Sequence, residues 1–127
     1  MEISISAKKK KDYLLIVSKG RLSVAADLLA HATMMYREII KYDLDKVLLE
    51  LTGTVLPQSL FAYYDLVNFY VANLPAKLRS LKMAVIVKES DQKMAEFWET
   101  VCANKGFRFK SFISLQAAAS WLVIKIA

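Results

Sequence analysis

The residues best suited to chemistry are hydroxyl-bearing side chains that follow an apolar run in the middle of the chain. Thr52 and Thr54 flank Gly53 directly after KVLLEL, and Ser59 comes five residues later. In open α/β sheets ligands bind at the carboxyl ends of strands, and the amino end of a helix favours an anion. We therefore predict that Thr52, Thr54 and Ser59 meet the polar head group of a small molecule, such as a carboxylate. An ordinary strand-to-helix connection is the alternative.

The segment 57–74, which contains Ser59, predicts a helix with more apolar surface than one sheet face requires. Its one polar stripe consists of Gln58, Phe61, Asp65, Asn68 and Ala72. A helix on a sheet needs an apolar stripe a little over ~100° wide, and this one is wider. The surplus predicts a ligand, a second subunit or neighbouring helices of the same chain. Tyrosine suits the first two, so we expect Tyr63 and Tyr70 to line the apolar part of a ligand site. We also expect Phe61, Tyr63 and Tyr70 to form a homodimer interface.

The chain's single histidine and single cysteine argue against catalysis and metal binding. His31 shares a helical stripe with Asp27 and Glu38, so we expect its side chain to be solvated. Asp27 and His31 lie one helical turn apart, but two ligands are too few for a zinc site. Cys102 is predicted to be a small core residue. No nucleophile–base pair is apparent. The sequence therefore predicts no enzyme, no catalytic residue, no metal and no cofactor.

Charge and hydropathy exclude further classes of protein. The net charge is +6, but apart from Lys8 to Lys11 the positive residues are scattered. In KGFRFKSF the basic and aromatic residues alternate as in a half-buried strand, so we expect no nucleic-acid partner. No window reaches the ~18 apolar residues of a membrane span. The amino terminus lacks the pattern of a secretory signal, which predicts a cytoplasmic protein. At 127 residues, we expect residues 1–127 to form a single domain.

The elements that must position these residues follow from periodicity and capping signals. Strands are predicted at 2–7, 13–18, 45–51, 81–89 and 107–113. Helices are predicted at 24–42, capped by Ser23, at 57–74, with Pro57 in the first turn, at 92–105 and at 115–122. The order is β-β-α-β-α-β-α-β-α. It predicts an α/β fold with a mixed, mostly parallel sheet, an antiparallel edge strand and covering helices.

This order and several segments resemble the STAS domain superfamily, in particular its SpoIIAA-like branch of small single-domain bacterial proteins. The segments are KVLLEL with its turn, MAVIV, FWETVCANKGFRFKSF and SLQAAASWL. The resemblance covers nearly the whole chain, but its motifs are hydrophobic and capping residues rather than catalytic ones. It implies a SpoIIAA-like fold.

The resemblance also implies a role for Ser59. Anti-sigma-factor antagonists carry a phosphorylatable serine at the start of the helix after the central strand, in an Asp-Ser-Ser-Gly-like context. Ser59 aligns with that serine, but Gln58, Leu60 and Phe61 depart from the pattern. We therefore expect a non-enzymatic binding or regulatory module that self-associates and takes an apolar or carboxylate-bearing small molecule. The alternative is a partner switch controlled by phosphorylation of Ser59, with a regulatory protein as partner.

Overall fold

The computed structural model describes residues 2–126. Five strands and four α-helices follow one another in the predicted order, which is therefore confirmed. The strands are β1 (Glu2–Lys9), β2 (Leu14–Arg21), β3 (Lys46–Val55), β4 (Lys82–Ile86) and β5 (Arg108–Phe112). The helices are α1 (Ala25–Tyr42), α2 (Leu60–Asn73), α3 (Gln92–Asn104) and α4 (Leu115–Leu122), and two short 3₁₀ helices are η1 (Ala76–Ser80) and η2 (Glu89–Asp91).

The strands form one mixed sheet in the order β1-β2-β3-β4-β5. β1 pairs antiparallel with β2, and every other neighbouring pair is parallel. The order equals the chain order because each parallel crossover contains a helix and advances by one strand, while the charged connection 10–13 turns β1 back on β2. The predicted α/β fold with one antiparallel edge is confirmed.

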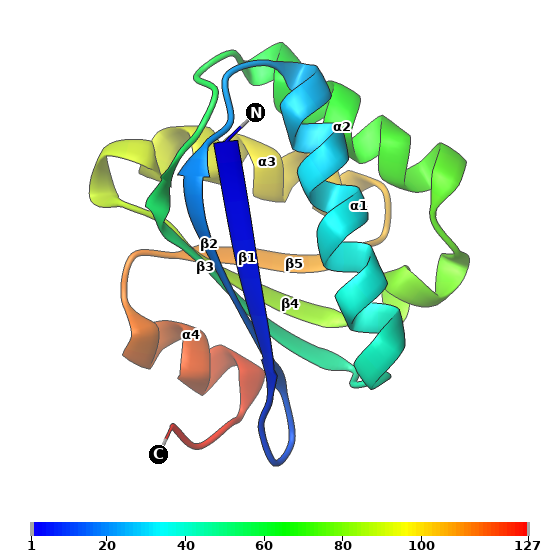
Figure 1. Ribbon diagram of the computed structural model, residues 1–127, viewed down its shortest axis with the longest axis vertical. Coiled ribbons are helices and arrows are strands. Elements are labelled where there is room, and N and C mark those ends of the chain that lie inside the picture. Colours follow the sequence, from blue (N-terminus) through cyan, green and yellow to red (C-terminus); the bar gives the residue numbers. More distant parts are fainter. Residues whose placement is uncertain (1, 127) are drawn as a thin grey trace.

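The helices cover the two faces of the sheet unequally. Figure 1 shows α4 at the lower left, on the other side of the sheet from α1, α2 and α3. The larger core lies under those three helices and includes Ile16, Leu49 and Val85. The smaller one lies under α4 and includes Leu48 and Ile86. Neighbouring residues of a strand thus enter different cores, as the two-residue period of a strand requires.

The predicted signals at the ends of α3 and α4 hold, but those at α1 and α2 shift. Gly106 follows α3 with φ +85°, and the Ser114 hydroxyl accepts from the Ala117 N–H at 3.1 Å to cap α4. α1 begins at Ala25, not directly after Ser23. The Asp27 carboxylate accepts from the Ser23 N–H at 2.8 Å and from the Val24 N–H at 3.3 Å, so Asp27, and not Ser23, supplies the side-chain hydrogen bonds at the start of this helix. Pro57 lies outside α2, which begins at Leu60.

β3 is longer than predicted and contains an irregularity. The Thr52-Gly53-Thr54 segment, predicted to be a turn, continues the strand and pairs with β2. Val17 lies opposite Glu50, and Lys19 lies opposite Gly53, so β3 has one residue more than β2 between these pairs. A bulge of this kind changes which face of the sheet the following side chains occupy. Within the part of the chain that the structure describes, no helix is both long and apolar enough to cross a lipid bilayer.

Candidate functional site

Ser59 lies at the amino end of α2, beside exposed apolar side chains. It is the N-cap residue and is exposed, and its hydroxyl makes no capping hydrogen bond within the described part of the chain. Phe61 is 80% exposed, and Leu60 and Tyr64 are 46% and 48% exposed. We call Leu60, Phe61 and Tyr64 the α2 surface. An aromatic ring this exposed gains nothing from the core, so its apolar area is available to a partner.

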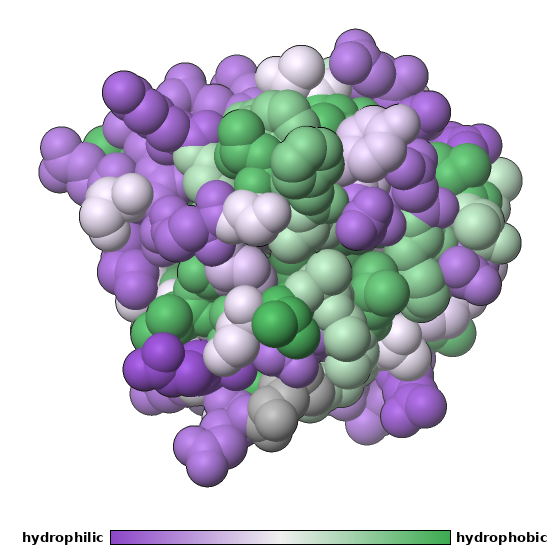
Figure 2. Space-filling model, turned by 90° about the horizontal axis from the view of Figure 1, so that it is seen from above, coloured by the Kyte–Doolittle hydropathy of each residue, from purple (hydrophilic) through white to green (hydrophobic). Residues whose placement is uncertain are grey.

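The α2 surface belongs to the end of the molecule at which the parallel strands finish. Val24, before α1, and Val55, at the end of β3, are also exposed at 57% and 42%. Figure 2, seen from the top of Figure 1, where the amino ends of α1 and α2 lie, shows hydrophobic groups between hydrophilic ones. This end therefore presents apolar area with a polar rim, which is the usual composition of a protein–protein contact surface.

The bulge in β3 separates the two threonines that were predicted to share a ligand site with Ser59. Thr52 is exposed, and its hydroxyl donates to the Glu50 carboxylate at 2.6 Å. Thr54 is 0% exposed, and its Oγ1 has no hydrogen-bond partner among residues 2–126. The two-residue period of a regular strand would have placed both on one face. The predicted cluster of Thr52, Thr54 and Ser59 is therefore wrong for Thr54, because the extra residue turns its side chain into the interior.

Tyr63 is a core residue, which corrects its assignment to a ligand site and a dimer interface. It is 0% exposed, and its hydroxyl donates to the Pro57 carbonyl at 2.7 Å. Its ring centroid lies 5.3 Å from that of Trp98 on α3. Burial raises the pKa of Tyr63 above its usual value. The side chain thus fastens α2 to α3 and to the chain before α2, and it is not available to a ligand or a second subunit.

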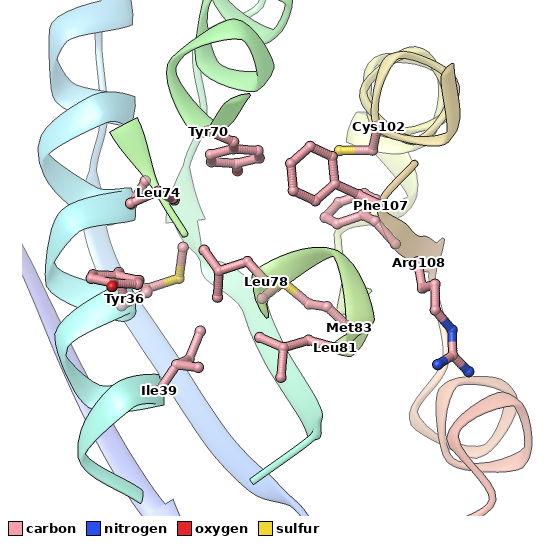
Figure 3. Close-up of a pocket in the computed structure, with 13 residues that line it drawn as sticks. Tyr36, Ile39, Tyr70, Leu74, Leu78, Leu81, Met83, Cys102, Phe107 and Arg108 are labelled. Atoms are coloured by element: carbon pink, nitrogen blue, oxygen red, sulfur yellow. The ribbon is translucent and has the colours of Figure 1, made fainter. Parts of the chain in front are cut away.

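Tyr70 lines an apolar cavity at the opposite end of α2. Its ring meets Phe107 edge-on, with 5.6 Å between the centroids. The cavity holds about 60 Å³ of free space between α1, α2, η1 and the first residues of β4 and β5. Figure 3 shows its walls, which include Ile39, Leu74 and Leu78. Of the five residues predicted to bind a ligand, Tyr70 alone is among those that line this cavity.

The position of this cavity differs from the predicted one. It lies where β4 and β5 begin, whereas a ligand site was expected where strands end. Leu78 and Leu81 come from the short 3₁₀ helix η1 and the residue that follows it. Sequence analysis did not predict η1, because a single helical turn has too few residues to show a period. The only available signal was the row of leucines at 74, 78 and 81.

His31 is buried, and the prediction that it is solvated is wrong. It is 3% exposed, and its Nε2 lies 2.7 Å from the Ser18 hydroxyl of β2. Leu28, Ala32 and Met35 are buried on the same face of α1. His31 belongs to this apolar stripe because it stands three residues after Leu28 and four before Met35. The hydrogen bond to Ser18 gives the Nε2 atom of the imidazole a partner in the core.

We expect acid to weaken the fold through His31. Burial lowers its pKa to about 4 from the usual 6.5. Between these values the unfolded chain binds the proton and the folded one does not, so stability is full above pH 6.5 and falls as the pH drops towards 4. Between pH 7 and pH 4.5 the loss from this group is expected to be about 2–3 kcal/mol.

Urea unfolding at both pH values measures this loss. His31→Gln is the control, because its amide can bond to Ser18 but does not titrate. The variant is expected to lose about 2–3 kcal/mol less than the wild type over the same interval. Equal losses in the two proteins would show that other groups cause the acid sensitivity.

The cysteine and the histidine are both in the interior. Cys102 is 1% exposed, as predicted for a core residue, and burial raises the pKa of its thiol to about 12. A thiol with that pKa is not a nucleophile near neutral pH. Among residues 2–126, no three side chains of His, Cys, Asp or Glu are grouped as metal ligands.

Comparison with known proteins identifies the fold. No protein-family model and no curated protein sequence matches the chain. Among solved structures, it is similar to an anti-sigma factor antagonist from Mycobacterium paratuberculosis, with a TM-score of 0.61 and 8% identity over 96% of this chain and 95% of that one. It is also similar to an uncharacterised protein of the DUF3478 family from Shewanella loihica PV-4, described as having a SpoIIAA-like fold. That comparison has a TM-score of 0.52 and 23% identity over 94% and 93% of the two chains. The protein therefore has a SpoIIAA-like α/β fold, as its sequence predicted.

Proposed function

We propose that this protein is a non-enzymatic regulatory module of the cytoplasm that binds a protein partner through the α2 surface. The observation that carries the proposal is the exposure of Phe61, at 80%, directly beside exposed Leu60 and Tyr64. Large aromatic residues are enriched at the centres of protein–protein interfaces, where they supply most of the binding energy. The similarity in fold to an anti-sigma factor antagonist supports a protein as the partner.

The size and position of this surface favour a reversible complex. A stable interface buries about 800 Å² of accessible surface on each partner, and about 20–30 residues of each partner take part in it. The α2 surface offers three large side chains at one end of a helix, which suits an anchor in a smaller, regulated contact. The inaccessible His31 and Cys102 also speak for binding rather than catalysis.

Ser59 supports a second, finer proposal, in which phosphorylation controls the contact. Its exposed hydroxyl precedes Leu60 and Phe61 in the chain and has no capping bond within residues 2–126. A phosphate there would add about −1.5 to −2 charges at the edge of the apolar surface, and the amino end of α2 would stabilise it. Phosphorylation is therefore expected to weaken a hydrophobic contact while leaving the fold intact.

Site-specific photocrosslinking in cells of the source organism tests the proposed function. A photoreactive phenylalanine analogue replaces Phe61, and the same analogue at Lys110, exposed on β5, serves as the control. We expect position 61, and not position 110, to crosslink repeatedly to one protein identified by mass spectrometry. With that protein purified, Phe61→Asp and Ser59→Asp are each expected to weaken binding at least tenfold, and Ser59→Ala less than twofold. The absence of any crosslink specific to position 61 would refute the proposed function.

Self-association through α2 remains a prediction. Phe61 is accessible for it, Tyr70 is half-buried in the wall of the apolar cavity, and Tyr63 is in the core. In the crosslinking experiment, a product with twice the mass of the chain would identify a second copy as the partner. In that case Phe61→Asp is expected to convert the dimer to a monomer in sedimentation velocity.

A further inference from the structure

The apolar cavity lies in a part of the molecule with an excess of positive charge. Residues 66–88 and 100–127 contain no Asp or Glu. These segments supply most of the cavity's walls, including those from the end of α2, η1, β4 and β5. Near η1, Asp43 is already paired with Lys77. The field around the cavity therefore favours an anion.

Arg79 is a cation beside the cavity's lining, and it still has an unmet hydrogen-bonding group. It lies in η1 between Leu78 and Leu81, which both line the cavity. Its guanidinium carbon is 5.5 Å from the centroid of the Phe107 ring, another wall of the cavity. Its Nε is shielded from solvent and has no hydrogen-bond partner among the described residues. A buried donor of this kind is costly unless something accepts from it.

Arg108 lies on the same rim but is already engaged. Its guanidinium donates to the Ser80 carbonyl at 3.3 Å. Figure 3 shows this group pointing away from the space between the apolar side chains. The two arginines thus differ in what they can offer a ligand, although they carry the same charge.

We propose that the apolar cavity binds the anion of a small carboxylic acid, with the hydrocarbon end between the helices and the carboxylate on Arg79. A guanidinium fits a carboxylate well because its N–H groups form a planar fork. The free space of about 60 Å³ limits the hydrocarbon end. An apolar cavity of about 150 Å³ binds benzene, which has six carbons, so this one suits a chain of about two to three carbons. The proposed site is independent of the α2 surface.

Methionine methyl NMR of the full chain tests the proposal, with butanoate, whose hydrocarbon end has three carbons, as the probe. Met35 and Met83 line the cavity, whereas Met94 is buried in the core outside its lining. We expect the methyl signals of Met35 and Met83 to shift and saturate at millimolar acid, and that of Met94 to stay unchanged. The corresponding alcohol, butan-1-ol, measures the contribution of the hydrocarbon alone.

Two arginine variants separate the roles of charge and position. Arg79→Gln is expected to weaken binding of the acid at least fivefold and binding of the alcohol less than twofold. Arg108→Gln removes the same charge from the rim and is expected to weaken acid binding less than twofold. Leu78→Phe, which adds volume to the wall, is expected to weaken both ligands at least fivefold, and the Met94 signal reports that each variant is folded.

Three results would overturn the proposal. The first is the absence of any shift of Met35 and Met83 at about 20 mM acid in the wild type. The second is equal affinity for acid and alcohol with no effect of Arg79→Gln, which would show an apolar cavity without a carboxylate site. The third is an equal shift of all methionine signals, including Met94, which would indicate binding without a defined site.

Discussion

Replacing Gly20 with alanine is expected to destabilise the protein by about 3–5 kcal/mol, more than any other alanine substitution at a glycine of this chain. Gly20 has a φ of +134°, which side chains other than glycine rarely adopt. A Cβ there would lie 2.1 Å from the Glu2 carbonyl oxygen and 2.8 Å from the Ile3 Cα. Both contacts are with backbone, so β1 would have to move away from β2.

The other two glycines are matched controls for this prediction. Gly106 also has a positive φ, of +85°, but the nearest atom to an added Cβ is Arg79 Cδ at 3.9 Å. Gly106→Ala is therefore expected to cost about 1–2 kcal/mol, from backbone conformation alone. At Gly53 the nearest atom would be the flexible Lys19 Cγ at 3.3 Å, and we expect less than about 1 kcal/mol.

Urea unfolding ranks the three variants, and hydrogen exchange locates the damage. Relative to the wild type, Gly20→Ala is expected to speed hydrogen exchange at the amides of β1 more than at those of β4. A cost no larger than that of Gly106→Ala would show that β1 is not held closely against Gly20.

Tyr63→Ala is expected to cost about 3–5 kcal/mol, while Phe61→Ala is expected to change stability by less than about 0.5 kcal/mol. The two aromatic residues are two positions apart in the first turns of α2, but Tyr63 is 0% exposed and Phe61 is 80% exposed. Removing the Tyr63 ring leaves a cavity against Trp98 and deprives the Pro57 carbonyl of its donor. Removing the Phe61 ring deletes only exposed surface.

Tyr63→Phe divides the first effect into its two parts. It keeps the ring and removes the hydroxyl, so we expect a loss of about 1–2 kcal/mol from the unpaired carbonyl. Thermal or urea unfolding measures all three variants. If Phe61→Ala proves as damaging as Tyr63→Ala, then Phe61 packs against the protein itself and the α2 surface is not free for a partner.

We propose different uses for the two ends of α2. Its amino end carries Ser59 and the α2 surface, and its carboxyl end closes the apolar cavity with Tyr70 and Leu74. A helix of 14 residues separates these ends by about 20 Å at 1.5 Å per residue. Tests of the partner contact and of the cavity therefore use different variants and different readouts.

The amino-acid sequence by itself determined the order of the elements, the cap at Ser114, the glycine after α3 and the burial of Cys102. It also indicated that α2 has more apolar surface than one sheet face needs, as its exposed Leu60, Phe61 and Tyr64 show. These features could be predicted because each depends on residues a few positions apart in the chain, through helical or strand periodicity and local hydrogen bonds.

Only the tertiary structure decided which side of α2 carries the surplus, where His31 lies and where the cavity forms. Tyr63 and Phe61 are both aromatic, and the contact with Trp98 on another helix selects Tyr63 for the core. The bulge that buries Thr54 exists only in the pairing of β3 with β2. The cavity needs α1, α2, η1 and two strands to meet. Each of these outcomes depends on contacts between segments far apart in the chain, which local periodicity does not encode.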